Sequence, residues 1–248
     1  MRWPANPTVG AMTAERIPAA PGRLLGEGRD SLVYDVGGGR VLRRYRRAKD
    51  TAAEARMMVW VRDHGMPVPE VFDADGADLV MERVEGRSLL DGLPTHPHRL
   101  PGAGRVLADL HHRLAAVPVA PWMTHRYVEG DVDDVRLGVV HCDLHPDNVM
   151  LGPSGPVLID WTRSCAGDRR ADLAHTWIVL AELGLPSSRV ERALQSAARR
   201  VLLRAFIRGI DRAGAAQWLP AIAADRMADK NTTDGERRRL ARYDRPAR

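Results

Sequence analysis

One segment of this 248-residue chain brings together residue types that can bind metal ions and move protons. Residues 141–148 read HCDLHPDN, and Asp160 follows twelve residues after Asn148. A carboxylate such as Asp143 can accept the proton of an attacking hydroxyl, while an amide oxygen and a second carboxylate can hold Mg²⁺ against phosphates. A short loop can deliver Asp143 and Asn148 together, and a following hairpin can bring Asp160 beside them. The set therefore suits phosphoryl transfer.

The same segment allows a second interpretation, a zinc site built from His141, Cys142, Asp143 and His145. These residue types are common zinc ligands. Consecutive residues rarely point in the same direction, however, and the sequence has no paired ligand cluster elsewhere. Phosphoryl transfer is therefore the favoured interpretation.

Strand signals dominate the chain before this segment. The pattern predicts one strand pair joined by Gly37 to Gly39 and another around Asp75 and Gly76. Between them it predicts a helix from about residue 52 to residue 64. Thr51 is the expected N-cap of this helix, and Glu54, three residues later, would complete a capping box.

Helical periodicity dominates the second half, and it predicts helices over 105–117, 171–183, 188–210 and 215–229. Strands first and helices later favour an α+β protein with two lobes and a hinge near residues 82–86. We expect an N-terminal lobe over 1–84, in which 1–20 form a loose leader, and a C-terminal lobe over 85–248.

These motifs resemble those of the aminoglycoside phosphotransferase and choline kinase group of protein-kinase-like enzymes. The resemblance covers roughly residues 24–180 and includes the His-Pro-x-Asn sequence at 145–148 and the Ile-Asp-Trp triplet at 159–161. It implies a bilobal kinase-like fold, with a small antiparallel sheet and one helix in the N-lobe and a mainly helical C-lobe. It also implies that Asp143 is the catalytic base, that Asn148 and Asp160 bind Mg²⁺, and that His141 braces the loop.

A nucleotide loop is implied by the same resemblance at Gly26, Gly28 and Ser31, which form a GxGxxS turn. Glycines let backbone N–H groups approach phosphate oxygens, although an ordinary hairpin loop explains the turn equally well. On the following strand the family has a lysine, and Arg43 occupies that place. The resemblance implies that Arg43 pairs with Glu54. The alternatives are an exposed edge-strand arginine and a glutamate that only caps its helix.

The end of the last N-lobe strand, VMERVEG at 80–86, is the implied adenine site. The backbone C=O of Glu82 and N–H of Val84 would pair with the adenine edge, with Met81 behind the ring. A plain strand end is the alternative.

Further downstream, Gly167 and Asp172 resemble a family motif whose aspartate braces the catalytic loop. A carboxylate stabilising a helix N-terminus is the alternative for Asp172. His111 and the other nearby histidines are expected at the surface or at the edge of the core.

The net charge of +5 is unevenly distributed. Residues 186–248 hold 15 Lys and Arg against 7 Asp and Glu, whereas the first 185 residues hold 22 against 25. A solvated helix face or tail explains this excess better than nucleic-acid binding, because no zinc-ligand spacing or aromatic-basic signature accompanies it.

Composition favours a globular protein, with 44% hydrophobic and 28% charged residues. There is no run of eighteen apolar residues and no apolar stretch at the start that would suit a signal peptide. Two cysteines are too few for a disulfide framework. We therefore expect a soluble cytoplasmic protein without a membrane partner.

The resemblance implies a kinase that uses ATP, or GTP, with Mg²⁺ to phosphorylate a hydroxyl of a small molecule. An aminoglycoside-type antibiotic is one candidate acceptor, which would make the protein a resistance enzyme. Five acidic residues could bind such a polycation, namely Asp211, Asp225, Asp229, Asp234 and Glu236. The positive charge of the same region argues instead for a neutral or anionic metabolite. A catalytically weak or inactive nucleotide-binding protein is a further alternative, and the oligomeric state stays open.

Overall fold

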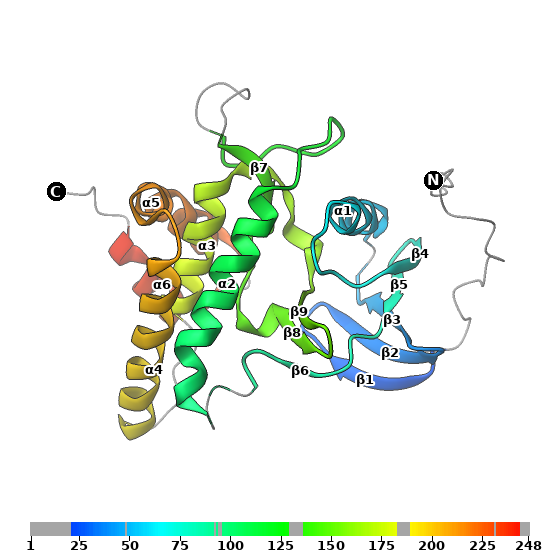
Figure 1. The fold of residues 1–248 in the computed structure, drawn as a ribbon, viewed down its shortest axis with the longest axis horizontal. Helices are drawn as coiled ribbons and strands as arrows, with labels where there is room; N and C mark the ends of the chain where they lie inside the picture. The colour runs from blue at the N-terminus through cyan, green and yellow to red at the C-terminus, as the bar shows by residue number, and fades with distance from the viewer. Residues whose placement is uncertain are drawn as a thin grey trace. The chain divides into compact units, whose positions relative to one another are not determined.

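The computed structural model describes residues 21–47, 49–91, 93, 96–128, 136–182, 189–230 and 232–243, with only the backbone for 189–195. The chain divides into two compact units. Unit 1 ends at Glu85 and unit 2 begins at Gly86 (Figure 1).

Unit 1 consists of an antiparallel sheet and one helix. The sheet has the strand order β1-β2-β3-β5-β4, with β1 (Arg23–Glu27), β2 (Ser31–Gly37), β3 (Arg40–Tyr45), β4 (Val71–Asp75) and β5 (Asp78–Glu82). Helix α1 (Ala52–Asp63) connects β3 to β4 and contacts β4. Gly37, Gly38 and Gly39 have φ values of 80°, 60° and 71°, a left-handed backbone that favours glycine, so this triplet makes the β2–β3 turn. The two strand pairs and the helix are therefore as predicted.

The core of unit 1 explains the pattern of its sequence. Leu42 of β3 and Leu79 of β5 are fully buried, and α1 contributes Met58 and Val61 from its inner face. Strand β3 pairs with both β2 and β5, so it is the central strand of the sheet. Side chains of β3 consequently have fixed surroundings, which is relevant to Arg43.

Unit 2 is mainly helical. Its helices are α2 (Leu100–Ala115), α3 (Arg169–Glu182), α4 (Arg189–Arg208), α5 (Arg212–Ala228) and α6 (Asp234–Leu240). Helix α2 begins five residues earlier than predicted because Pro101 suits the first turn of a helix. Short antiparallel strands accompany the helices, with β7 (Leu137–Val140) paired to β10 (Cys165–Asp168), and β8 (Val149–Gly152) lying between β6 (Arg87–Ser88) and β9 (Gly155–Leu158).

Helices α2 and α3 pack against β7, and α3 also contacts β10, whereas β8 and β9 lie at one side of the helices (Figure 1). Helices α2 and α4 cross at Gly104, where an added Cβ would lie 2.7 Å from the backbone oxygen of Leu202. Helices α3 and α5 share an apolar core that includes Ile178, Trp218 and Ile222. None of the helices in the described ranges is long and apolar enough to span a bilayer.

Candidate active site

The segment 141–148 forms a loop directly after β7, and it holds Asp143 and Asn148 together. Asn148 ends a 3₁₀ turn, Pro146–Asn148, which starts with a proline. Its Nδ2 donates to the backbone oxygen of Asp143 at 2.9 Å and reaches Asp143 Oδ2 at 3.5 Å. The amide nitrogen therefore fixes the Asp143 main chain, and the amide oxygen is the end of Asn148 suited to a cation.

A hairpin brings Asp160 back to this loop, as the spacing predicted. Strands β8 and β9 pair antiparallel with Val149 opposite Leu158, and the N–H of Ile159 donates to the Asn148 oxygen at 2.9 Å. Asp160 itself has a left-handed backbone, with φ 63° and ψ 68°. Such a conformation is costly for a residue with a Cβ and is concentrated at functional sites. Amide and carboxylate oxygens from Asn148 and Asp160 form a donor set that fits Mg²⁺.

Asp172, on the first turn of α3, braces the loop 141–148. Its carboxylate accepts hydrogen bonds from the backbone N–H groups of His141 at 3.1 Å and Cys142 at 2.7 Å. Cys142 has a φ of 62°, so these bonds hold a strained residue immediately before Asp143. Gly167 lies close to this region, where an added Cβ would be 2.4 Å from the Arg126 backbone oxygen.

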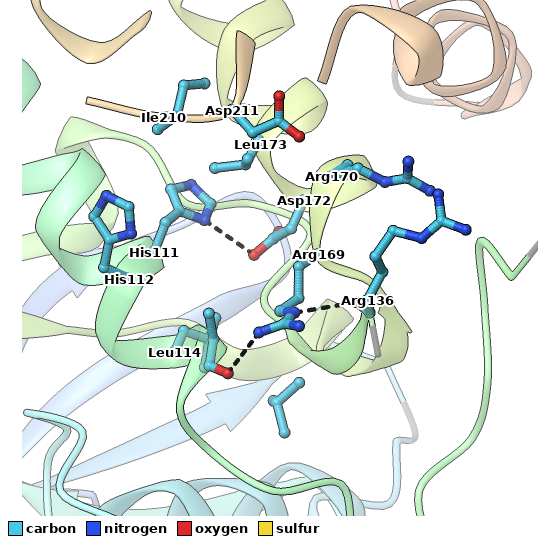
Figure 2. A pocket seen from close by; sticks show the side chains of 12 residues that line it. His111, His112, Leu114, Arg136, Arg169, Arg170, Asp172, Leu173, Ile210 and Asp211 are labelled. Atoms are coloured by element: carbon cyan, nitrogen blue, oxygen red, sulfur yellow. Dashed lines mark hydrogen bonds and ion pairs between the residues drawn. The ribbon is translucent and has the colours of Figure 1, made fainter. Parts of the chain in front are cut away.

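His111 is the second part of this brace, and its predicted place at the surface or the core edge is wrong. The ring is buried, with Nδ1 3.3 Å from Asp172 Oδ2 and Nε2 2.8 Å from Thr176 Oγ1, and Thr176 donates to the Leu144 backbone oxygen at 2.7 Å. Figure 2 shows His111 of α2 pointing at Asp172 of α3. A histidine on the apolar stripe of α2, between Leu110 and Leu114, was the sequence signal for this role.

A pocket of about 290 Å³ lies beside this brace (Figure 2). His111 and Asp172 line it together with Arg136, Arg169 and Arg170, but Asp143, Asn148 and Asp160 do not. The arginines already have protein partners, since Arg169 donates to the backbone oxygens of Arg136 and Ala115, and Arg170 pairs with Asp168. This pocket is therefore separate from the three candidate residues Asp143, Asn148 and Asp160.

The charges around Asp143 keep it ionised. Burial alone would raise the pKa of Asp143, but the hydrogen bond and charge of His145, with further charge from His141 and Arg226, bring that pKa well below its ordinary value. Burial lowers the pKa of His141. Burial would also raise the pKa of Asp172, but its contacts with His111 and the loop N–H groups lower it to about 2.

The zinc interpretation gains no support from the loop. His141 Nε2 lies 3.1 Å from the Ile159 backbone oxygen, whereas the Cys142 sulfur lies 3.9 Å from that of Cys165. The side chains thus point to different partners. Across the described ranges, no group of three or more His, Cys, Asp or Glu side chains is arranged to hold a metal ion.

In unit 1, Arg43 and Glu54 form the ion pair that the resemblance implied. Arg43 Nη1 lies 3.1 Å from Glu54 Oε1, and its Nε donates to Ser31 Oγ at 3.2 Å. The side chains of both charged residues are mostly buried. Arg43 is therefore not an exposed edge-strand residue, and it ties Ser31, next to the glycine turn, to helix α1.

The predicted capping box is absent from the start of α1. Thr51 makes no capping bond to the helix, because its hydroxyl donates to the Asp78 backbone oxygen at 2.8 Å. The other oxygen of Glu54 instead accepts from Tyr45 at 2.6 Å and lies 3.4 Å from Lys49 Nζ. Lys49 was not predicted as a partner of Glu54. The sequence indicated this contact only by placing a positively charged residue five positions before Glu54.

The glycine turn is open. An added Cβ at Gly26 would meet nothing within 4 Å, and one at Gly28 would meet Ser31 atoms only at 3.4 Å or more. Neither glycine is required by packing within unit 1. In β5, Met81 lies opposite Val41, and the N–H of Glu82 donates to the Glu70 oxygen at 2.8 Å, with Val84 two residues further on.

The acidic residues considered for a polycationic acceptor already have structural roles. Asp225 pairs with Arg126 and Arg163, and Asp229 pairs with Arg163. The remaining three stabilise helix starts: Asp211 caps α5, Asp234 lies in the first turn of α6, and Glu236 completes the α6 capping box with Thr233.

Comparison with known proteins places this geometry in a family. The chain matches the phosphotransferase enzyme family over residues 21–135 and 126–218. It is 27% identical to an aminoglycoside 3'-phosphotransferase of Streptomyces fradiae, over 51% of this chain and 63% of that protein. A thiamine kinase of Salmonella newport is 39% identical over 49 residues, which are 20% of this chain and 18% of the kinase. The chain thus covers less than two thirds of these curated relatives.

Solved structures show the same fold. One is a thermostable mutant of aminoglycoside phosphotransferase APH(4)-Ia in complex with AMP-PNP and hygromycin B, with a TM-score of 0.61 and 19% identity over 90% of this chain and 91% of that chain. Another is a choline/ethanolamine kinase family protein from Mesorhizobium loti, with a TM-score of 0.54 and 19% identity over 91% of this chain and 88% of that one. The predicted protein-kinase-like α+β fold is therefore confirmed, as is the resemblance to the aminoglycoside phosphotransferase and choline kinase group. The chain belongs to the phosphotransferase enzyme family.

Proposed function

We propose that the protein is a kinase that transfers the γ-phosphoryl group of ATP, with GTP as the alternative donor, to a hydroxyl of a small molecule. The observation that carries this proposal is the loop of unit 2. It holds an ionised Asp143, Asn148 and Asp160 on one short loop and its following hairpin, and Asp172 and His111 brace it from within the core. A protein that only bound nucleotide would have no use for so complete a set.

Asp143 orients the acceptor and receives its proton. The acceptor oxygen bonds to the γ-phosphorus as its proton passes to Asp143, and the bond from that phosphorus to the bridging oxygen breaks, so that ADP leaves. Because the pKa of Asp143 is low, it is a weak base, and its main contribution is to hold the hydroxyl in line.

Asn148 and Asp160 would hold Mg²⁺ through their side-chain oxygens. The ion would neutralise charge on the phosphate oxygens. The left-handed backbone of Asp160 directs its carboxylate from the hairpin end, and the Ile159–Asn148 hydrogen bond keeps the two ligands adjacent in the fold.

Unit 1 supplies the proposed phosphate and adenine contacts. Arg43, held by Glu54 and Ser31, offers a guanidinium in place of the usual lysine, and the open glycines at 26 and 28 leave the backbone accessible to a ligand. Met81, Glu82 and Val84 remain the proposed adenine site.

The test is ADP release from Mg-ATP with a panel of hydroxylated acceptors, using Asp143→Asn as the inactive variant. We expect its rate to fall by roughly 10²- to 10⁴-fold. Asp147→Asn is the matched control, since Asp147 lies in the same loop but is exposed, and it should keep wild-type activity. Full activity in Asp143→Asn would refute the mechanism. Binding of Mg-ATP without turnover of any acceptor would identify a nucleotide-binding protein instead.

A further inference from the structure

The surroundings of Asp143 carry information about the acceptor, because the acceptor hydroxyl must approach this carboxylate. Arg226 of α5 is the cation nearest to it from the C-terminal helices, with Nη1 3.9 Å from Asp143 Oδ1. That separation is longer than a hydrogen bond. Within the described residues the Arg226 side chain has this one ion pair and no hydrogen bond, so its N–H groups can still bind a ligand.

A second guanidinium lies in the same charged cluster, that of Arg163. It pairs with Asp225 and Asp229, yet its Nε is buried and has no hydrogen-bond partner in the part of the chain that the structure describes. A buried donor without a partner is costly, and an acceptor oxygen would satisfy it. The side chains of Arg226, Arg163 and Asp143 are each 28–30% exposed, so all three are open to a ligand.

The charges of this cluster do not suit a polycation. Asp225 and Asp229 are neutralised by Arg126 and Arg163, and a ligand ammonium would have to displace those guanidinium groups. It would also be repelled by Arg226 next to the reacting hydroxyl. An anion, in contrast, would find a half-buried guanidinium whose donors are still available.

Building on the proposed phosphotransferase function, we propose that the acceptor is a hydroxylated small molecule carrying a carboxylate or a phosphate ester, and that this anionic group binds Arg226 while the hydroxyl faces Asp143. Arg226 is then the residue that determines acceptor specificity. Guanidinium groups bind both kinds of anion in a bidentate manner, so the shared chemistry is a planar or tetrahedral oxyanion.

The experiment uses matched acceptors that differ in charge: glycerate, glycerol and 3-amino-1,2-propanediol, and glucuronate, glucose and glucosamine. Glycerol 3-phosphate separates a phosphate from a carboxylate, and hygromycin B represents the polycations. Two readouts are taken with the full chain, namely ADP release from Mg-ATP and the melting temperature of the Mg-ADP complex. We expect the anionic member of a set to raise the melting temperature more than its neutral partner does, and to have at least a tenfold higher kcat/KM.

Arg226→Met should raise KM for the anionic acceptor about ten- to hundredfold, the effect of losing a charged hydrogen bond, with kcat changed much less. Arg226→Lys should restore part of the affinity. Arg212→Met is the control, because Arg212 is exposed on the same helix roughly four turns away. It should leave both readouts unchanged.

Several results would overturn the proposal. One is an equal or better response to neutral or ammonium acceptors, and another is the absence of any stabilisation by the anions beyond that by their neutral partners. A fall in kcat for every acceptor in Arg226→Met, without a change in charge preference, would show that Arg226 only positions Asp143. Turnover of hygromycin B alone, abolished by Asp143→Asn, would refute the anionic acceptor while supporting the phosphotransferase. Failure to bind Mg-ATP would instead refute the phosphotransferase itself.

Discussion

The two units hold their candidate functional groups in different ways. In unit 2 the buried carboxylate of Asp172 accepts two hydrogen bonds from the backbone of the candidate catalytic loop, and His111 contacts that carboxylate. In unit 1 the guanidinium of Arg43 is held by two side chains, those of Glu54 and Ser31. Hydrogen bonds thus fix backbone atoms of the loop in unit 2, whereas in unit 1 they hold the end of a long side chain.

This difference matches the demands of the proposed chemistry. In-line phosphoryl transfer depends on the placement of the base to within a fraction of an ångström, whereas a cation near phosphates acts through a longer-range charge effect. Two strained residues, Cys142 and Asp160, flank the rigid site, and no such strain is found at Arg43 or Glu54. We therefore expect unit 2 to tolerate substitution less well than unit 1.

The largest effect is expected from Asp172→Asn. The change removes a buried charge that accepts two backbone hydrogen bonds and takes the carboxylate away from His111 Nδ1, so the free energy of unfolding should fall by about 3–5 kcal/mol. Chemical denaturation measures this loss. Asp109→Asn, at an exposed position of α2, is the control, and an equally small loss in both variants would contradict the brace.

A smaller effect is expected at Arg43, and it should appear in binding rather than in folding. Arg43→Met should raise KM for Mg-ATP roughly ten- to hundredfold, because a mostly buried guanidinium that can face phosphate is lost. Arg43→Lys should recover most of the affinity, and Lys49→Met should change KM only a fewfold because Lys49 is more exposed. Steady-state rates at varied Mg-ATP concentration measure these KM values, and an unchanged KM in Arg43→Met would remove Arg43 from the nucleotide site.

The smallest effect concerns His175, the buried histidine of α3. Its two ring nitrogens have no hydrogen-bond partner among the described residues, and burial lowers its pKa to about 4. In the unfolded chain His175 binds a proton near pH 6.5, whereas in the folded chain it does so only near pH 4. The free energy of unfolding therefore falls as the pH drops from 6.5 towards 4. Between pH 7 and 5.5 the loss should be about 1 kcal/mol.

His175→Phe should remove the His175 share of this pH dependence and so reduce the slope, without loss of stability at pH 7, because no hydrogen bond is broken. His112→Phe, at an exposed position of α2, should retain it. Denaturation midpoints at several pH values measure the slope. A strong destabilisation of His175→Phe at neutral pH would show that His175 makes a hydrogen bond in the folded protein, as His111 does.

The loop 141–148 with its following hairpin, and the strand pairs of unit 1, could be predicted because their information is local. The spacing from Asp143 to Asn148 and Asp160 indicates a turn followed by a hairpin. The three glycines at 37–39 indicate the β2–β3 turn. Where local patterns competed with distant partners, prediction failed. Thr51 and Glu54 have the spacing of a capping box, but each binds a partner outside the helix.

By itself, the sequence determined the family, the order of strands and helices, and the identity of the proposed base and metal ligands. Only the tertiary structure decided which charges neutralise one another. His111 meets Asp172 from 61 residues away, and Arg226 meets Asp143 from 83 residues away. The physical reason is that an ion pair depends on the distance between two side chains in space, and no periodicity along the chain encodes that distance.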